Sequence, residues 1–429
     1  MYPSPFSKDA LMSCFRSGDS IKFGVNVAEE METIVDRTIA ALDSDTISFS
    51  HDTVQLRNGR SIFRIQDVEG ALILRALSKR LVNQHKIKIP SRDQIVRGVI
   101  EGLLDATPYN ILRCDISSFY ENVDVRSLVD DITSSTRTHP SIKQVFRKLE
   151  GVGLLDLGSL GIPRGLGLSA VLAELELRKF DHEARQIQDV YRYFRFADDM
   201  LVFCTGPTSR LFTDLSQILP INLQFNDKTV PVEIVNFPHS DKDPCDAPAS
   251  TIDYLGYKFS MENGVKHKRS RVVKVSISDN KIASRKTKIV LSLKRFVKDK
   301  DAKLLVLRLK YLTSNFEISR TGQTHAPNRK RVKTGIYYNY HFCGKYVDDK
   351  SGPRLVEHDA HDLKALDGFM NSLLWGANSE FRSQVEVNLS AAEMAALRQL
   401  SFYAGFSKRM TKRFTRAQVS DIRKAWQNA

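Results

Sequence analysis

The sequence YRYFRFADDMLVF, residues 191–203, places two adjacent aspartates between two segments that favour strands. The aromatic first half favours a pleated strand, and the apolar run 200–203 is typical of a buried one. The segment therefore predicts a hairpin with Asp198 and Asp199 at its turn. Two carboxylates there supply the hard oxygen ligands that Mg²⁺ requires. Aspartate is also a common turn residue, so an ordinary acidic turn is the alternative.

A third carboxylate, Asp115, ends the β-prone run YNILRCD at residues 109–115. If that strand lies beside the hairpin, three acids meet at one place. Such a group can hold two metal ions about 4 Å apart, the arrangement that serves in-line phosphoryl transfer. Between these segments, residues 161–170 (GIPRGLGLSA) form a Gly/Pro loop that runs into a helical apolar pattern. Glycines in such a loop let the backbone approach a substrate closely.

Taken in order, these segments resemble the palm motifs of bacterial reverse transcriptases. Residues 115–120 (DISSFY) are similar to the first metal-binding motif, and residues 162–165 (IPRG) to the loop that positions template and nucleotide. Residues 196–199 (FADD) match the catalytic double-aspartate box. The resemblance continues through a lysine motif at 226–229 (NDKT) and a primer-grip hairpin at 252–257 (IDYLGY), and it spans about residues 60 to 260.

Two positions depart from the pattern of that family. Phe196 stands where tyrosine is commoner, and Arg164 stands where glutamine is usual. Neither change removes a metal ligand. The arginine puts processivity and template handling in question.

The resemblance implies a catalytic group of three residues, Asp115, Asp198 and Asp199. Asp115 and Asp198 are expected to bind two Mg²⁺ ions, for which Mn²⁺ can substitute. Asp199 is expected to lie beside these two aspartates, and the backbone carbonyl oxygen of Ile116 is expected to complete the coordination shell of the metals.

The resemblance also assigns residues to the nucleotide. Tyr120 falls where an aromatic ring lies under the sugar and excludes a 2′-hydroxyl, although a core aromatic is the alternative. Lys228 is expected to protonate the leaving pyrophosphate, unless it is a solvated turn lysine. The expected nucleotide-binding residues are Arg64, Tyr120, Pro163, Gly165 and Lys228.

Basic residues upstream and downstream are candidates for contacts with phosphates. A hairpin is predicted at residues 56–64 with Asn58-Gly59 at its turn. Arg57, Arg60 and Arg64 are expected to project from this hairpin; we favour Arg64 as the contact to the triphosphate and take the others as solvated surface charges. The residues expected to bind nucleic acid are Arg164, Tyr254, Gly256, Lys294 and Arg295.

The charge of the chain is concentrated in one block. The 429 residues carry a net charge of +14, and residues 264–334 hold 21 Lys/Arg against 4 Asp/Glu, a surplus of 17. The rest of the chain therefore carries a net charge near −3. A block of this kind predicts salt-dependent binding to a nucleic-acid backbone. Simple amphipathic helices with solvated basic faces are the alternative.

We predict an α+β right-hand polymerase with fingers, a palm with an antiparallel sheet, a thumb and a helical C-terminal region. The tyrosine-rich segment 335–342 favours a packed strand, and capping boxes at 390–393 and 415–418 predict helix starts. No nuclease domain is expected. The predicted domains are an N-terminal region with fingers at 1–105, a palm at 106–260, a basic thumb at 261–334, and a mainly helical domain at 335–429.

The cysteines indicate an intracellular protein. The five are dispersed, without metal-site spacing, which favours reduced thiols. The sequence shows neither a long apolar stretch nor a signal-peptide pattern. A cytoplasmic protein without a membrane partner is expected.

The predicted activity is that of an RNA-directed DNA polymerase. The flanks look like those of defence-associated bacterial reverse transcriptases, and this resemblance implies antiphage defence. Its implied partners are dNTPs, a DNA product, a non-coding RNA template and a second reverse transcriptase. Two alternatives stay open: a template-independent or protein-primed DNA polymerase, and a non-catalytic RNA-binding scaffold on a polymerase fold.

Overall fold

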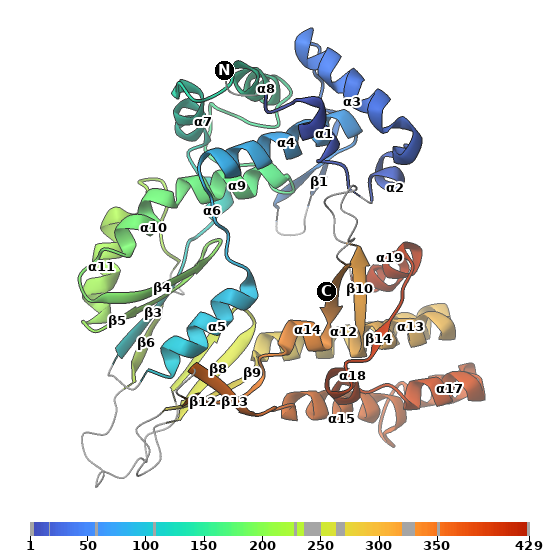
Figure 1. Ribbon diagram of the computed structural model, residues 1–429. Helices are drawn as coiled ribbons and strands as arrows, with labels where there is room; N and C mark the ends of the chain where they lie inside the picture. Colours follow the sequence, from blue (N-terminus) through green and yellow to red (C-terminus); the bar gives the residue numbers. More distant parts are fainter. Residues whose placement is uncertain are drawn as a thin grey trace. The chain divides into compact units, whose positions relative to one another are not determined.

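A computed structural model of the chain describes residues 4–16, 18–55, 59–105, 109–226, 230–235, 250–262, 271–319, 331–349 and 352–426. The chain forms two compact units, whose elements are labelled in Figure 1. Unit 1 comprises residues 1–95, 109–234 and 319–330, and unit 2 comprises residues 96–108, 235–318 and 331–429. The boundaries of the four predicted domains remain predictions.

Unit 1 begins with helices around a two-stranded hairpin. The helices are α1 (Lys8–Met12), α2 (Asp19–Phe23), α3 (Val27–Asp43) and α4 (Val68–Gln84), and α5 (Arg92–Leu103) starts in this unit. Strands β1 (His51–Gln55) and β2 (Ser61–Ile65) pair antiparallel, with Asp52 opposite Arg64. Gly59 has a positive φ of 76° in their connection, as the predicted hairpin requires. Asn58 and Arg57 lie outside the described residues.

The predicted palm sheet has four strands, in the order β4-β5-β3-β6. They are β3 (Tyr109–Asp115), β4 (Val190–Phe196), β5 (Asp199–Cys204) and β6 (Val230–Val235). Both neighbours β3 and β4 run antiparallel to β5. Because side chains alternate along a strand, Cys114 and Met200 enter the core while Asp115 and Asp199 lie on the opposite face. The antiparallel sheet expected from sequence is confirmed.

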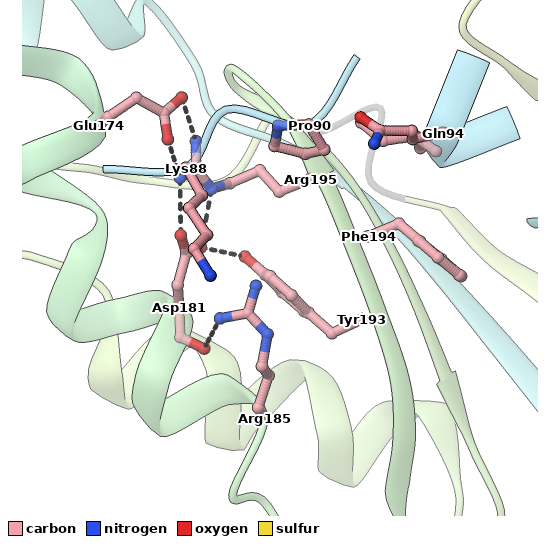
Figure 2. A pocket seen from close by; sticks show the side chains of 10 residues that line it. Lys88, Pro90, Gln94, Glu174, Asp181, Arg185, Tyr193, Phe194 and Arg195 are labelled. Carbon is pink, nitrogen blue, oxygen red and sulfur yellow. Dashed lines mark hydrogen bonds and ion pairs between the residues drawn. The ribbon is translucent and has the colours of Figure 1, made fainter. Parts of the chain in front are cut away.

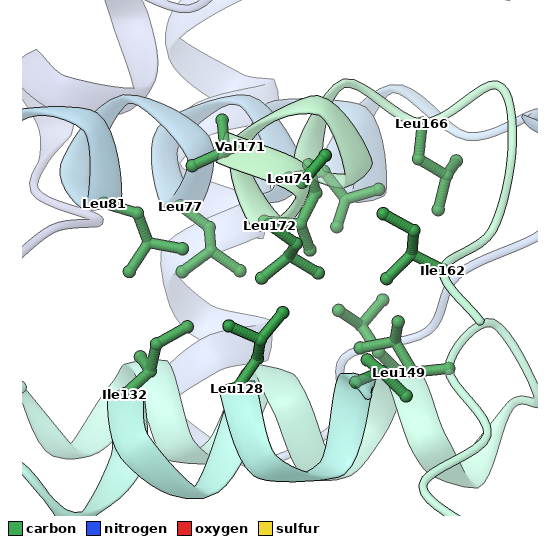
Figure 3. Packing of buried hydrophobic residues seen from close by; sticks show 14 of the residues in the cluster. Leu74, Leu77, Leu81, Leu128, Ile132, Leu149, Ile162, Leu166, Val171 and Leu172 are labelled. Atoms are coloured by element: carbon green, nitrogen blue, oxygen red, sulfur yellow. The ribbon is translucent and has the colours of Figure 1, made fainter. Parts of the chain in front are cut away.

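Helices supply the core behind that sheet. They are α6 (Phe119–Asn122), α7 (Val125–Ser134), α8 (Pro140–Gly151), α9 (Gly167–Glu176), α10 (Arg178–Ala184) and α11 (Thr208–Ile218). Figure 3 shows leucines of α4, among them Leu77, beside Leu172 of α9 and Leu128 of α7. Leu77 and Leu172 have no exposed surface. The apolar helix predicted after the Gly/Pro loop is therefore α9, and it fixes the end of that loop to the core.

Unit 2 contains a five-stranded sheet in the order β13-β12-β9-β8-β7. Its strands are β7 (Ser250–Tyr254), β8 (Tyr257–Glu262), β9 (Val272–Ile277), β12 (Gly344–Asp349) and β13 (Gly352–Glu357). Each strand pairs antiparallel with its neighbour. Leu255 and Gly256 both have positive φ, at 48° and 80°, which is the signature of a type I′ hairpin turn. The predicted primer-grip segment is thus a tight hairpin.

Helices make up most of the remainder of unit 2. They are α12 (Asp279–Asp299), α13 (Ala302–Thr313), α14 (Ile336–Tyr340), α15 (His361–Trp375), α16 (Arg382–Asn388), α17 (Ala391–Arg398), α18 (Phe402–Ser407) and α19 (Arg416–Lys424). A small sheet has the order β11 (Arg331–Gly335), β10 (Asn315–Ser319), β14 (Thr411–Lys412). Both predicted capping boxes are present, at Ser390 and at Thr415. The largely helical character predicted for residues 335–429 is confirmed.

Within the tyrosine-rich segment 335–342, residues 336–340 form helix α14, and the expectation of a strand is wrong. Gly335 has a φ of 125°, which turns the chain sharply out of β11. The backbone N–H of Tyr337 then donates to Oδ1 of Asn315 at 2.8 Å. Ile336 and Tyr340, four residues apart, are both buried. Tertiary contacts with Asn315 and the core thus override the strand preference of the tyrosines.

None of the helices within the described ranges combines the length and the apolar character needed to cross a membrane. Four of the cysteines fall within the same ranges, and all four are free and buried: Cys14, Cys114, Cys204 and Cys343.

Unit 1 carries a destabilising carboxylate that yields the first prediction. Burial, followed by the charges of Asp124 and Asp131, raises the pKa of Glu176 from its ordinary 4.5 to about 7. A raised acid pKa favours folding at low pH, and that contribution is lost as the pH rises from 4.5 through 7. We expect Glu176→Gln to raise the free energy of unfolding by roughly 1–3 kcal/mol at pH 8 and by less than about 1 kcal/mol at pH 5.

Urea unfolding of the wild type and the variant at both pH values measures this difference. Asp214→Asn, at a half-exposed position on α11, serves as the control and should show no such dependence on pH. A Gln variant that is equally or less stable at pH 8 would contradict the prediction.

Candidate active site

The three predicted catalytic aspartates meet at one end of the β3–β5 pair. Asp115, the last residue of β3, lies directly opposite Asp199, the first residue of β5. Ala197 and Asp198 form the two-residue turn between β4 and β5, and the N–H of Ile116 donates to the carbonyl oxygen of Asp198 at 3.3 Å. The predicted acidic hairpin turn is therefore present, and the end of β3 lies beside it.

The turn itself is conformationally unusual. Ala197 has a φ of 57°, in the left-handed region that non-glycine residues rarely occupy. A positive φ at the first central position is typical of type II′ turns, where glycine is preferred. Something outside the turn must therefore stabilise this geometry.

The pKa values of Asp198 and Asp199 reflect the burial of these acids and the charges around them. Burial, with a further contribution from the charge of Asp115, raises the pKa of Asp198 above its ordinary range. Burial likewise raises the pKa of Asp199, although the guanidinium of Arg113 partly offsets it. Arg113 donates to both carboxylate oxygens of Asp199, at 3.1 and 3.2 Å. The amide nitrogen of Asn226 lies 3.3 Å from Oδ2 of Asp115.

Sequence reasoning missed the role of Arg113. A signal was available, because Arg113 lies two residues before Asp115 and therefore shares its face of the strand. Asn226 falls within the segment that was predicted as the lysine motif, but as a partner for Asp115 it was also missed.

The chemistry of these residues fits a divalent cation. Carboxylates and a backbone carbonyl are hard oxygen donors. Burial, which raises the pKa of Asp198 and of Asp199, makes their negative charges costly, and a cation beside them would stabilise those charges. The backbone brings the three aspartates to the same strand ends, but within the described parts of the chain no three His, Cys, Asp or Glu side chains are arranged as a group that could hold a metal ion. The carboxylate of Asp199 already accepts hydrogen bonds from Arg113. Asp115 and Asp198 are therefore the residues best placed to hold a metal.

A buried arginine supports the hairpin from the helix-facing side of the sheet. Arg195 on β4 donates through Nε and Nη2 to Asp181 on α10, at 2.7 and 2.6 Å. The same guanidinium donates to Glu174 on α9 at 3.2 and 2.7 Å. Its Nη1 also donates to the carbonyl oxygen of Ala197 at 2.9 Å. This last contact stabilises the strained turn that presents Asp198.

Figure 2 shows this network at the wall of a cavity of about 250 Å³. Tyr193 donates from its hydroxyl to Asp181 at 2.7 Å, and Arg185 stacks on the Tyr193 ring at 4.7 Å. Burial alone lowers the pKa of Arg195, but the hydrogen bonds to Asp181 and Glu174 outweigh it, so the pKa lies above its ordinary value. Arg195 is therefore a charged anchor between the sheet and two helices.

A second cavity, of about 360 Å³, lies between the β1–β2 connection and the Gly/Pro loop. Tyr120, Glu121 and Arg164 are among its lining residues. Burial, and then the charge of Asp198, raises the pKa of Tyr120, which places its ring near the acidic site. Its neighbour Phe119 is 1% exposed and belongs to the core. Tyr120 is half-buried and packs against the core, so the alternative of a core aromatic stays open for this residue.

The Gly/Pro loop is attached to strand β2. The N–H of Phe63 donates to the carbonyl oxygen of Arg164 at 2.8 Å. Gly165 follows with a φ of 95°, and a Cβ there would lie 2.5 Å from the carbonyl oxygen of Phe63. Only glycine permits this close approach.

The structure places the other predicted nucleotide-binding residues as follows. Arg64 is exposed on β2, whereas the charge of Arg60 reaches Asp198 and lowers its pKa. The carbonyl oxygen of Pro163 accepts a hydrogen bond from Ser169 on α9. Lys228 lies outside the described residues.

The remaining predicted nucleic-acid contacts lie in unit 2. Tyr254 is 1% exposed, so its side chain packs in the core and only the turn at Leu255 and Gly256 could face a ligand there. Lys294 and Arg295 are exposed on α12, next to the buried Leu293. Arg295 pairs with Asp299 one turn later. The helix is amphipathic, as the alternative reading of the basic block predicted, and its outer face is basic.

Because Gly165 lies so close to Phe63, a methyl group added at position 165 should have a large effect on stability and activity. Gly165→Ala must displace the loop from β2 and adopt an unfavourable φ, and should lower the free energy of unfolding by roughly 2 kcal/mol. Nucleotide incorporation should fall with it, because Arg164 moves with the loop. Chemical denaturation and an incorporation assay test both effects. Gly167→Ala is the control, because a Cβ there meets nothing within 4 Å; equal behaviour of the two variants would contradict the prediction.

The Arg195 network predicts strong destabilisation when its cation is removed. Arg195→Met leaves Glu174 and Asp181 without their buried partner, which should lower the free energy of unfolding by about 3–5 kcal/mol. Arg185→Met is the matched control, because Arg185 is exposed and hydrogen-bonds only to the backbone oxygen of Asp181. Denaturant unfolding measures both variants. A loss no greater than that of the control would show that Arg195 is not an anchor.

Comparisons with known proteins identify the family. No curated protein sequence matches the chain. A solved structure of telomerase from Candida albicans in complex with a TWJ fragment of telomeric RNA is similar, with a TM-score of 0.30 and 15% sequence identity. The similarity covers 55% of this chain and 42% of the telomerase chain, so this chain spans about two fifths of that protein.

The reverse transcriptase (RNA-dependent DNA polymerase) family matches residues 45–259, which is half of the chain. The match includes all of the strands that carry the three aspartates. It confirms the predicted α+β polymerase fold class and the predicted enzyme class, since RNA-directed DNA polymerases are nucleotidyltransferases. The chain therefore belongs to the reverse transcriptase family.

Proposed function

We propose that this chain polymerises deoxynucleotides on an RNA template by a two-metal mechanism. The observation that carries the proposal is the meeting of Asp115, Asp198 and Asp199 at one end of the β3–β5 pair. Closely spaced acids, of which Asp198 and Asp199 have raised pKa values, are typical of sites that bind cations and phosphates. Membership of the family supports the same reaction.

In this proposal Asp115 and Asp198 hold two Mg²⁺ ions together with the carbonyl oxygen of Ile116. When bound, the ions supply Lewis-acid chemistry: they favour deprotonation of a 3′-hydroxyl and neutralise charge on the leaving pyrophosphate. Mn²⁺ has the same ligand preferences. Arg113 keeps the carboxylate of Asp199 in a fixed orientation beside them.

The chain's own residues orient the substrate. Tyr120 presents its ring beside Asp198 and excludes a 2′-hydroxyl, which favours deoxynucleotides. Arg60, rather than Arg64, has its charge close to the acids, and it is the better candidate to contact the triphosphate. The basic outer face of α12 suits the backbone of a template–product duplex.

The biological role is proposed from the resemblance of the regions that flank the palm. Those regions are similar to defence-associated bacterial reverse transcriptases. We therefore propose a cytoplasmic enzyme that copies a dedicated non-coding RNA during antiphage defence, together with a second reverse transcriptase.

Substitution of the aspartates tests the proposed chemistry. Asp115→Asn and Asp198→Asn preserve side-chain shape but remove the charge, and each should reduce incorporation of labelled dNTPs by about 1,000-fold or more. The assay uses purified protein with its co-purifying RNA and Mg²⁺, and it is repeated after chelation of the metal. Asp214→Asn, at a half-exposed position on α11, should leave incorporation unchanged. Undiminished incorporation by the Asp198 variant would overturn the assignment.

Sequencing the product separates the remaining mechanisms. A DNA product complementary to the bound RNA supports templated synthesis. A product without any complement indicates untemplated synthesis, and a product linked to tyrosine indicates protein priming. Absence of product with and without added RNA, despite tight RNA binding, would favour the non-catalytic scaffold.

A further inference from the structure

Glu121 and Arg164 form a bidentate ion pair at the edge of the 360 Å³ cavity. Nε of Arg164 lies 2.7 Å from Oε1 of Glu121, and Nη2 lies 3.0 Å from Oε2. Nε of Arg60 approaches the same Oε1 at 3.5 Å. Parallel contacts of this kind fix the plane of the guanidinium, whatever their net contribution to stability. The hydrogen bond from Arg164 accordingly lowers the pKa of Glu121.

The fixed guanidinium lies over the ring of Tyr120. Its central carbon is 4.7 Å from the ring centroid, within the range of a cation–π contact. The ring also meets Phe119 edge-on, at 5.7 Å between centroids. Phe119 is buried and immobile in the core, whereas Arg164 is 26% exposed and depends on Glu121 for its position. Of these two contacts, the one with Arg164 is therefore adjustable.

The backbone couples these residues to the same loop. The N–H of Ile162 donates to the carbonyl oxygen of Tyr120 at 2.7 Å. Tyr120, Glu121 and Arg164 all line the cavity. An arginine with Nε and Nη2 engaged by a carboxylate is poorly placed to hydrogen-bond a nucleotide base through those atoms. Nη1 is not part of this pair, and the guanidinium contacts Tyr120 through its carbon, which lies over the ring.

We propose that the Glu121–Arg164 pair is a positioning element that holds the ring of Tyr120 and so sets the discrimination between deoxyribose and ribose. This inference rests on the proposed polymerase function and deepens it. The pair acts through Tyr120 and does not itself touch the reacting atoms. Loosening the pair lets the ring move away, and a 2′-hydroxyl then fits.

Sugar discrimination in variants of the pair tests the inference. Glu121→Gln removes the charge, and Arg164→Lys keeps the charge but loses the flat bidentate group. Each should lower the ratio of kcat/KM for a dNTP over the matching NTP by roughly three- to thirtyfold, the factor that corresponds to a typical cation–π contact. The double variant should lose no more than the stronger single variant, because both residues act through one contact.

A purely structural role predicts a different result. It would lower incorporation of both sugars together and leave the ratio unchanged. Arg37→Gln is the matched control, because Arg37 pairs with Glu69 at 2.6 Å in the same unit but does not line the cavity. An unchanged ratio in both Glu121→Gln and Arg164→Lys, while Tyr120→Ala abolishes discrimination, would overturn the proposal.

Fluorine NMR provides a readout that does not depend on catalysis. The 13 tyrosines are labelled as fluorotyrosine, and Tyr120→Phe identifies the Tyr120 signal. We expect that signal to shift or broaden in Glu121→Gln and Arg164→Lys and to be unaffected in Arg37→Gln. An unchanged signal overturns the proposal even in an active enzyme. A changed signal in a protein that incorporates neither sugar supports the positioning role and counts against the proposed polymerase function instead.

Discussion

The antiparallel register of β3 and β5 is the constraint on which the site depends. It places Asp115 opposite Asp199 on one face and Cys114 opposite Met200 in the core. Because side chains alternate with a period of two, a slip of one residue would bury the acids and expose the apolar partners. Burial of the core side therefore enforces the meeting of carboxylates on the other side. The same apolar residues that stabilise the fold determine where its charges lie.

Charges brought together in this way require partners. Arg113 neutralises part of the charge of Asp199 on the acidic face, and Arg195 joins Glu174 and Asp181 on the opposite face. The hydrogen bond from Arg195 to Ala197 links the two. The left-handed conformation of Ala197 in the turn is tolerated because the buried guanidinium of Arg195 donates a hydrogen bond to the carbonyl oxygen of this residue. Stability and the geometry of the acids thus depend on the same residue.

The loop that carries Arg164 shows how a cavity wall is built from segments that are distant in sequence. Gly165 allows the loop to lie against Phe63 of β2, and Ile162 attaches it to Tyr120. Arg164 can then reach Glu121, 43 residues away in sequence. An arginine at a position where glutamine is usual is explained by this partner. The departure from the family pattern is one half of an ion pair.

The sequence by itself determined the features that depend on local periodicity and local chemistry. These are the hairpin with Asp198 at its turn, the helix after the Gly/Pro loop and the two capping boxes, whereas the hairpin at residues 252–257 followed from the resemblance to the family. Only the tertiary structure decided which side chains meet across the fold, as Arg113 does with Asp199 and Glu121 with Arg164. It also made residues 336–340 a helix, because the amide of Tyr337 finds Asn315. Strand alternation and capping act over a few residues and leave a pattern in the sequence, whereas contacts between distant residues depend on packing, which no local pattern records.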